Sequence, residues 1–396
     1  MFHLISKFDN FMKNLVVLGS TGSIGISTLD VVRKNKKLFK VEALIANTNY
    51  QLMIDQYEEF RPSFIYLANN EARKSFLENV RNLDKTTTVL SSEDEITPIL
   101  GSEDVDIVIA AIVGFAGLKP VYNSLLNGKQ VLLANKESYV VAGEFLNKIA
   151  KESNSTIFPI DSEHSAIHQC LQGIESNESV SRLILTGSGG PFLRRDIADF
   201  ASITPDEAIA HPVWSMGKKI SVDSSTMMNK CLEIIEARWL FDIEEIDVII
   251  HPEGIIHSLV EFNDNSVIAQ LSMPDMKIPI AHALGFPEKI TSGVEKLNLA
   301  QIGNLSFEEP NLQKFPAIRL AEECLKEGGS SFTILNAANE VCVDAFLERK
   351  IGYLDIHKII TKVLDKSHIT DVKEVEEFFE VDKKSRYETN AIIAVN

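Results

Sequence analysis

The spacing of hydrophobic and polar positions divides the chain into parts that favour different architectures. In the amino-terminal part, short apolar runs that suit buried strands alternate with stretches whose apolar residues recur every three or four positions. We expect these strands at residues 15–18, 39–46, 64–68, 106–113 and 130–137. Because strands that alternate with helices build parallel sheets, the pattern predicts an α/β, Rossmann-like domain over residues 13–160.

Beyond this sheet, the strand-like runs follow one another with fewer helical stretches between them. They occur at residues 155–161, 181–190, 246–252, 254–262 and 266–274. They predict a central α+β domain over residues 161–295, and a stretch rich in Pro, Asn and Gly predicts a linker at 296–316. From 317 to 396, apolar residues recur at i, i+3 and i+4 in four segments, which predicts a C-terminal helical bundle domain.

The charge of the chain is strongly acidic, with 39 Lys and Arg residues against 56 Asp and Glu residues and a net charge of −17. Nucleic acids and anionic membranes bind basic surfaces, so we expect neither as a partner. No apolar run is long enough to span a membrane. A bound phosphate must therefore be held by local geometry.

Cysteine usage and the amino-terminal segment bear on location. Four scattered cysteines without a CxxC pair favour a reducing cytoplasm. Residues 1–11 have neither a sustained apolar region nor a small-residue cleavage site, so we expect no signal peptide. No transit peptide is visible, although the sequence alone leaves a plastid origin open.

A glycine-rich segment, "GSTGSIG" at residues 19–25, follows the first expected strand and precedes a helix expected from about Ser23. It fits the G-x-x-G-x-x-G form of the dinucleotide turn, in which the backbone approaches a pyrophosphate and the helix start offers free N–H groups. An ordinary strand-to-helix turn is the alternative. The context favours nucleotide binding.

The end of the second strand bears on which nicotinamide cofactor would bind. Glu42 lies near the spacing of a ribose-binding acid, but it comes early in the strand, where a charged edge residue is the simpler interpretation. The strand end carries Asn47, Thr48 and Asn49 instead. Uncharged donors can accept a 2′-phosphate that an acid would repel, so NADP is favoured over NAD, although no Lys or Arg lies there.

Acidic residues in two distant segments suggest a metal site. Asp161 and Glu163 stand two residues apart at a strand end, which predicts that both side chains point to one face. Asn229 and Glu233 share one helical face, behind Ser224 to Thr226, which resemble an N-cap. Like charges about 4 Å apart cost roughly 4 kcal/mol at an effective dielectric constant of ~20, so a cation or solvent must offset them. Three carboxylates suit Mg²⁺ or Mn²⁺.

Two other interpretations of these acids stay open at this point. His164 and His168 have the i, i+4 spacing of zinc ligands, although not in the H-E-x-x-H order. Alternatively, the carboxylates are solvated on the surface.

Two loops are candidates for contacting a ligand. The glycines from 187 to 190, with Ser188, could form a backbone nest for a phosphate or a plain turn. Residues 211–220 carry His211, Trp214 and Met216 beside Gly217, a composition that suits a lid, although Trp214 could belong to the core.

The chain resembles the 1-deoxy-D-xylulose 5-phosphate reductoisomerase family in six segments that occur in the same order. They are "GSTGSIG", "LLANKES", "DSEHSA", "TGSGGPF", "HPVWSMGKKISVDSSTMMNKCLEIIEA" and "NAANE". The resemblance implies a homodimer that uses NADPH and a divalent metal to convert 1-deoxy-D-xylulose 5-phosphate to 2-C-methyl-D-erythritol 4-phosphate. That reaction, a step of non-mevalonate isoprenoid biosynthesis, would combine retro-aldol and aldol steps with a hydride transfer.

The resemblance also implies roles for the matching residues. Mg²⁺, Mn²⁺ or Co²⁺ would be bound by Asp161, Glu163 and Glu233, and His164 and His168 would be structural. Lys136, Glu163 and Lys230 would be catalytic. The phosphorylated sugar would contact Lys136, Ser162, Glu163, Ser188, His211, Trp214, Ser224, Asn229, Lys230 and Glu233. NADPH would contact Thr21, Gly22, Ser23, Ile24, Asn47, Thr48, Asn49, Asn135, Glu137, Met216 and Gly217.

One segment departs from the family pattern. Family members often have Ala-Gly-Lys-Asn where this chain has "ANTN", so Asn47 replaces a glycine and Thr48 a lysine. The missing cation puts the strength of the preference for NADPH in question.

Two rival functions have weaker support. A semialdehyde-dehydrogenase-like enzyme needs a nucleophilic cysteine, and Cys170, in an apolar helix-like setting, is a poor candidate. A non-catalytic NADP sensor would have no need of three converging carboxylates and two lysines.

Overall fold

The computed structural model describes residues 12–211, 214 and 216–395. Residues 1–11, on which the signal-peptide expectation depends, lie outside the described part of the chain. Within that part, no helix combines the length and the apolar character needed to cross a membrane.

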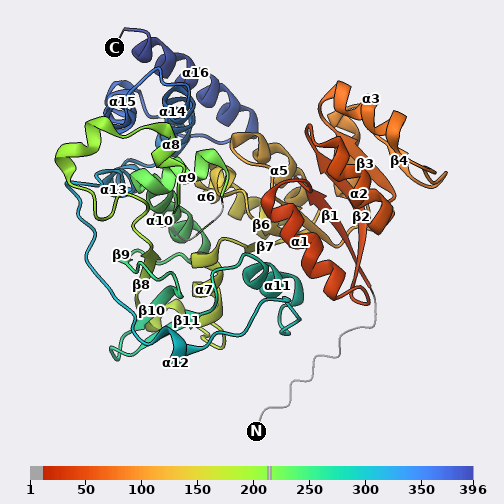
Figure 1. Ribbon diagram of the computed structural model, residues 1–396, viewed down its shortest axis with the longest axis horizontal. Coiled ribbons are helices and arrows are strands. Elements are labelled where there is room, and N and C mark those ends of the chain that lie inside the picture. Colours follow the sequence, from red (N-terminus) through yellow and green to blue (C-terminus); the bar gives the residue numbers. More distant parts are fainter. Residues whose placement is uncertain (1–11, 212–213, 215, 396) are drawn as a thin grey trace.

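A seven-stranded sheet forms the first layer of the fold, shown in red to yellow at the right of Figure 1. Its order is β4-β3-β2-β1-β5-β6-β7, and every pairing is parallel. The strands are β1 (Lys13–Leu18), β2 (Phe39–Ala46), β3 (Phe64–Leu67), β4 (Thr88–Val89), β5 (Ile107–Ala110), β6 (Gln130–Leu133) and β7 (Thr156–Pro159). The predicted α/β, Rossmann-like fold is therefore confirmed.

The connections of this sheet are helical, as the periodicity predicts. They are α1 (Ser23–Lys34), α2 (Tyr50–Phe60), α3 (Asn70–Asn79), η1 (Glu93–Glu95), α4 (Ile96–Gly101), η2 (Phe115–Gly117), α5 (Leu118–Leu126) and α6 (Lys136–Ser153). The strand order reverses at β1, which lies between β2 and β5, so the crevice at the carboxyl ends of these strands is where such sheets bind ligands.

One strand lies in a different sheet from the one expected. Residues 155–161 read as a strand of the central part, but β7 pairs with β6 at the edge of the first sheet. The apolar pattern identifies a strand without identifying its partner, and β4, only two residues long, has no pattern to detect.

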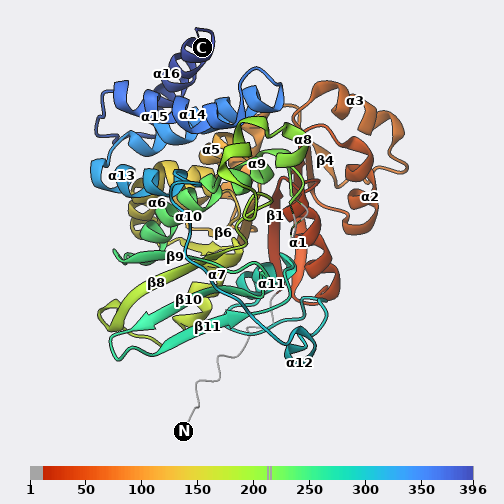
Figure 2. The ribbon, with the colours of Figure 1, turned by 60° about the vertical axis from the view of Figure 1, so that its left-hand side comes forward.

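A second sheet of four strands lies below the first part in Figure 2. Its order is β11-β10-β8-β9, with β8 and β9 parallel and the other pairs antiparallel. Its strands are β8 (Val180–Gly187), β9 (Ile246–Ile250), β10 (Ile256–Phe262) and β11 (Val267–Leu271). The helical elements of this part are α7 (Ser162–Cys170), η3 (Asn177–Ser179), η4 (Ile197–Ser202), α8 (Pro205–Ala208), α9 (Lys218–Thr226), α10 (Met228–Phe241) and α11 (Lys277–Gly285).

The remaining elements are helices, shown in blue in Figure 1. They are α13 (Ala317–Glu327), α14 (Ser331–Leu347), α15 (Tyr353–Lys366) and α16 (Val375–Ile393). The stretch expected to be a plain linker contains α12 (Leu299–Ile302), and its Glu308 makes an antiparallel bridge with Ile250.

The hydrophobic core is shared between the central sheet and the C-terminal helices. Leu183 of β8, Ile235 of α10 and Ile359 of α15 belong to one buried cluster. Phe378 of α16 instead packs with residues of α5 and α6 in another cluster. The C-terminal helices thus brace both other parts of the molecule.

Candidate active site

A cavity of about 180 Å³ opens between the first turn of α1, the start of α7 and the start of α10. Many residues named from the sequence line it, namely Ser23, Ile24, Lys136, Asp161, Ser162, Glu163, Ser188, His211, Trp214, Met216, Gly217, Ser224, Asn229, Lys230 and Glu233. Ala134, Gly187, Gly189, Ile220, Met227 and Met276 complete the lining. Segments as far apart in the sequence as Ser23 and Met276 therefore meet in one pocket.

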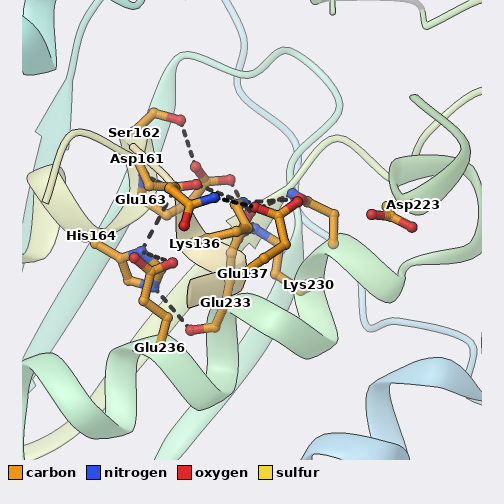
Figure 3. A network of polar contacts seen from close by, with 12 residues as sticks. Lys136, Glu137, Asp161, Ser162, Glu163, His164, Asp223, Lys230, Glu233 and Glu236 are labelled. Atoms are coloured by element: carbon orange, nitrogen blue, oxygen red, sulfur yellow. Dashed lines mark hydrogen bonds and ion pairs between the residues drawn. The ribbon is translucent and has the colours of Figure 1, made fainter. Parts of the chain in front are cut away.

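The predicted metal ligands converge in this cavity, as Figure 3 shows. Asp161, Glu163 and Glu233 each offer a carboxylate oxygen, and these oxygens lie within 4.8 Å of one another. Asp161 and Glu163 point to the same place because of a helix start, and not because of the alternation along a strand that the sequence suggested. The strand ends at Pro159, Asp161 is the N-cap of α7, where it accepts a hydrogen bond from the Glu163 amide at 3.2 Å, and Glu163 lies in the first turn.

The third carboxylate is positioned by α10. This helix begins at Met228, after Met227 in the left-handed conformation, so Ser224 lies in the last turn of α9 and does not cap α10 as the sequence suggested. The predicted i, i+4 pair is present, since Asn229 Nδ2 donates to Glu233 Oε1. Only 1% of the Glu233 side chain is exposed.

Two lysines lie among the three carboxylates. Lys136 Nζ lies 2.6 Å from Asp161 Oδ2, 3.0 Å from Glu233 Oε1 and 2.9 Å from Asn229 Oδ1. Lys230 Nζ lies 2.8 Å from Glu163 Oε1 and also contacts Glu233 and the Thr186 carbonyl oxygen. Two ammonium groups face three carboxylates, so when all three acids are ionised one negative charge is left for a cation to neutralise.

The pKa values of the acids report this crowding. Burial and the neighbouring Glu233 carboxylate raise the pKa of Glu163 to about 7, although Lys230 partly offsets them. Burial would also raise the pKa of Asp161, but the charges of Lys136, His164 and Lys230 outweigh it and lower that pKa. Carboxylate oxygens are hard donors, so a group of them with unneutralised negative charge suits Mg²⁺ or Mn²⁺.

The two histidines do not form the i, i+4 zinc pair. His164 is buried, with Nε2 2.9 Å from the Glu233 carbonyl oxygen and Nδ1 3.2 Å from Glu236 Oε2. His168 turns away, and its Nδ1 lies 2.9 Å from His282 Nε2. Asp161, His164 and Glu236 also have ligand atoms within 4.8 Å of one another. Burial would lower the pKa of His164, but the carboxylates of Glu236 and Asp161 outweigh it and raise that pKa to about 9. His164 is therefore protonated near pH 7, and its contact with Glu236 is an ion pair that accounts for this grouping.

A second turn of the cavity wall suits a phosphate. Ser188 Oγ lies 3.2 Å from His211 Nε2 and accepts a hydrogen bond from the Gly190 amide at 3.3 Å. Gly190 has φ +65°, and a Cβ there would come within 2.8 Å of the Ser224 carbonyl oxygen. The turn therefore requires glycine so that Ser188 and Ser224 can line the same wall.

The expected lid contributes His211, Trp214, Met216, Gly217 and Ile220 to the cavity lining. Trp214 lies with its ring centroid 6.2 Å from that of His257, and its amide donates to His211 Nδ1 at 2.9 Å. The loop is shorter than the expected 211–220, since α9 begins at Lys218. Residues 212, 213 and 215 lie outside the described part of the chain.

The glycine turn lies at the switch point of the parallel sheet. Gly19 has φ +87°, and a Cβ there would come within 2.4 Å of the Ala111 carbonyl oxygen after β5. Gly22 is the N-cap of α1 and offers no side-chain cap, so the first amides of the helix, next to Thr21, are available to a ligand. Only Ser23 and Ile24 of this turn reach the cavity.

Five other cofactor candidates lie outside the cavity lining. Asn47, Thr48 and Asn49 are exposed after β2, and Asn49 caps α2 by accepting from the Leu52 amide at 3.1 Å. Asn135 caps α6, and the carboxylate of Glu137 pairs with Lys219 at 2.8 Å. Glu42 pairs with Lys40 at 2.8 Å within β2, but β2 is an interior strand, so the structure does not place Glu42 at an edge of the sheet.

Sequence reasoning missed residues that hold the others in place. Glu236 follows Glu233 by three residues, so helical spacing already placed it on a nearby face. Lys219 and Asn339 gave no such signal, because their partners lie on other elements.

A dinucleotide-type sheet beside a pocket of carboxylates and lysines defines a class, that of metal-assisted, nicotinamide-dependent oxidoreductases. Three family models match the chain: 1-deoxy-D-xylulose 5-phosphate reductoisomerase over residues 15–143, its C-terminal domain over 157–241 and the DXP reductoisomerase C-terminal domain over 271–388. The chain belongs to the 1-deoxy-D-xylulose 5-phosphate reductoisomerase family.

Individual relatives agree over nearly their whole length. The 1-deoxy-D-xylulose 5-phosphate reductoisomerase of Haemophilus ducreyi is 47% identical, with 95% of this chain and 98% of the relative covered. That of Shewanella halifaxensis is 45% identical, with 97% and 100% covered. A DOX-P reductoisomerase crystallised with NADPH, fosmidomycin and magnesium has a TM-score of 0.92 at 42% identity, covering 97% of this chain and 99% of that one. The Zymomonas mobilis enzyme in complex with NADPH has a TM-score of 0.89 at 38% identity, with 96% and 98% covered.

Proposed function

We propose that this pocket converts 1-deoxy-D-xylulose 5-phosphate to 2-C-methyl-D-erythritol 4-phosphate with NADPH and a divalent metal, as an oxidoreductase and isomerase of non-mevalonate isoprenoid biosynthesis. The observation that carries the proposal is the convergence of Asp161, Glu163 and Glu233 with Lys136 and Lys230 beside a dinucleotide turn. A non-catalytic NADP sensor would not need this cluster.

In this proposal, Asp161, Glu163 and Glu233 hold Mg²⁺ or Mn²⁺, with Co²⁺ as a further candidate. When bound there, the ion would supply Lewis-acid chemistry to the sugar oxygens and NADPH would supply the hydride. Lys136 and Lys230 are anchored by the same carboxylates, so their ammonium groups are oriented before substrate arrives. They can offset negative charge on the substrate oxygens while the carbon skeleton rearranges.

The phosphate of the substrate would bind where the Ser188 turn, the end of α9 and the start of α10 line the cavity. Ser188, Ser224 and Asn229 supply hydroxyl and amide groups there, and His211 lies against Ser188. Burial lowers the pKa of His211, so it is expected to act as a neutral hydrogen-bonding group near pH 7. Ser162 Oγ donates to Glu163 Oε2 at 2.5 Å, which places it beside the metal ligands. Trp214 would cover the substrate and exclude water.

NADPH would lie along the carboxyl edge of the first sheet. Its pyrophosphate would bind at Thr21, Gly22, Ser23 and Ile24, where the start of α1 offers free amides. Asn135 and Glu137, with Met216 and Gly217 of the lid, would lie near the nicotinamide, and Asn47, Thr48 and Asn49 would face the 2′-phosphate. The division into residues 13–160, 161–295, 296–316 and 317–396 is part of this proposal.

A homodimer and a cytoplasmic location complete the proposal. β11 is an edge strand with Val267 and Ile268 about half exposed, at 47% and 46%, a surface that a second copy could cover. The four free cysteines are all buried, which suits a reducing compartment. Sedimentation equilibrium is expected to give twice the 44.1 kDa of one chain.

The test follows NADPH absorbance in the presence of 1-deoxy-D-xylulose 5-phosphate, with and without Mg²⁺ or Mn²⁺. We expect metal-dependent oxidation that falls at least about 100-fold in Glu233→Gln, since that variant loses a metal ligand and a lysine partner. Glu244→Gln, at an exposed position after α10, is the matched control and should retain activity. NADPH that binds but is never oxidised with either metal would instead favour the sensor.

A further inference from the structure

A lysine outside the cavity lining connects three parts of the molecule. Lys219 lies in the first turn of α9, directly after the lid residues, and its side chain is only 17% exposed. Its Nζ lies 2.8 Å from Glu137 Oε1 and 2.8 Å from Asp223 Oδ2. Glu137 belongs to α6, which connects β6 and β7 of the first sheet, whereas Asp223 lies one turn further along α9.

Both carboxylates are held by further partners. Asp223 Oδ1 accepts a hydrogen bond from Asn339 Nδ2 of α14 at 2.9 Å. Glu137 Oε2 faces Asn135 Nδ2 at 3.3 Å, and the same amide donates to the Gly114 carbonyl oxygen after β5 at 2.8 Å. The contacts therefore run from the C-terminal helices through α9 to the loop after β5 and the start of α6.

The Lys219–Glu137 contact joins α9 to the first sheet. The Glu137 and Asp223 side chains are 5% and 2% exposed, so water screens their charges little. In Figure 3, Glu137 lies beside Lys136, while Asp223 lies farther along on α9. A buried ion pair of this kind restricts the relative positions of its two partners, because separating them leaves a buried charge without solvent or a counter-ion.

The position of α9 matters to both ends of the pocket. Gly217, the N-cap of α9, ends the lid loop, and Ser224 lines the phosphate wall in its last turn. After Met227, the chain continues directly into α10, which carries Asn229, Lys230 and Glu233. The orientation of α9 thus decides where the lid ends and where Ser224 points.

We propose that Lys219 is a positioning residue that couples the cofactor site to α9 by bridging Glu137 and Asp223. The inference rests on the proposed function, since it assigns Glu137 and its neighbours to the NADPH site. Binding of NADPH beside Asn135 and Glu137 fixes the position of the Glu137 carboxylate. Through the Lys219–Glu137 ion pair it also fixes the position of α9. A fixed α9 in turn strengthens cofactor binding, because coupling between two sites is reciprocal.

The first experiment measures hydrogen exchange of the unmodified chain, after its NADPH-dependent turnover has been established. NADPH alone, without substrate or metal, is expected to slow amide exchange in residues 218–226. Unchanged exchange there in a chain that turns over overturns the bridge and leaves the proposed function standing. Absence of turnover sinks the proposed function itself.

The second experiment compares variants by the Kd of NADPH, measured from the fluorescence of the bound dihydronicotinamide. Lys219→Met is expected to raise this Kd about tenfold, a typical coupling between sites, while Mn²⁺ binding followed by electron paramagnetic resonance stays unchanged. Asp223→Asn keeps the Lys219–Glu137 contact and should change the Kd less. Lys384→Met removes an exposed lysine that also faces an acid at i, i+4 and serves as the matched control.

A double-mutant cycle separates the bridge from general stability. If Lys219 acts through Glu137, adding Lys219→Met to Glu137→Gln changes the Kd of NADPH less than about twofold. A melting temperature that falls while the Kd of NADPH stays at the unmodified value overturns the proposal, as that result describes a purely structural residue. Should Lys219→Met not fold, the exchange measurement on the unmodified chain decides.

Discussion

The metal and lysine cluster and the loop after β2 are both assigned to ligand binding, yet they are built in opposite ways. In the cluster, Lys230 and Glu233 are almost completely buried and each has several charged or polar partners. In the loop, Asn47 and Thr48 are exposed, and only Asn49 has a structural task, as the cap of α2. Chemistry that develops charge needs groups whose orientation is fixed in advance, whereas an exposed cofactor phosphate can be read by groups that solvent also reaches.

The difference predicts how each region responds to substitution. Buried, interlocked charges lose several interactions at once and leave partners unpaired, so their effects are large. Exposed polar groups are screened by solvent, so their effects are small. The following predictions are ordered by this expectation.

The largest effect is expected for Asp161→Asn. The substitution removes a metal ligand and the partner of Lys136 while keeping the shape of the side chain and its ability to cap α7. Mn²⁺ affinity, measured by calorimetry, should fall at least about 100-fold, beyond the 10–100-fold typical of groups that only support a ligand. Metal binding that survives the change would remove Asp161 from the metal site.

An intermediate effect is expected for Gly190→Ala. The new Cβ would meet the Ser224 carbonyl oxygen at 2.8 Å in a backbone with φ +65°, so the phosphate wall must shift. The strain should cost about 1–3 kcal/mol in the free energy of unfolding and raise the KM for the phosphorylated substrate.

Gly173→Ala is the control for backbone strain alone. Gly173 has φ +84° with nothing within 4 Å, so it shares the unusual conformation without the clash. If both variants raise the KM equally, the close approach of Gly190 to Ser224 has no role in binding.

The smallest effect is expected for Thr48→Lys. A lysine at this exposed position should pair with the 2′-phosphate and lower the KM for NADPH about threefold to fivefold, as exposed ion pairs contribute up to about 1 kcal/mol. The KM for NADH should not change. Thr86→Lys, which adds the same charge ahead of β4, controls for a general electrostatic effect. An unchanged KM for NADPH would show that position 48 does not contact the 2′-phosphate.

Local sequence information was sufficient for the elements but not for their partners. The glycine turn, α1 and the i, i+4 pair of Asn229 and Glu233 follow from neighbouring residues, and the structure confirms them. The assignment of residues 155–161 to the central part was wrong, because an apolar run does not specify the strand it pairs with. The N-cap predicted at Ser224 to Thr226 was misplaced for a similar reason, since these residues end α9 and Met227 is the N-cap of α10, although Thr226 Oγ1 accepts a hydrogen bond from the Met228 amide at 3.3 Å.

The amino-acid sequence by itself determined the class of fold and the dinucleotide turn, because these depend on residue type and short-range spacing, and its resemblance in six ordered segments indicated the family and the three acids that would bind a metal. The tertiary structure alone decided that Lys136 lies among acids of α7 and α10, that His164 pairs with Glu236, and that Lys219 joins α9 to α6. Those contacts cross between elements, and their geometry depends on how the sheets and helices pack rather than on any local pattern.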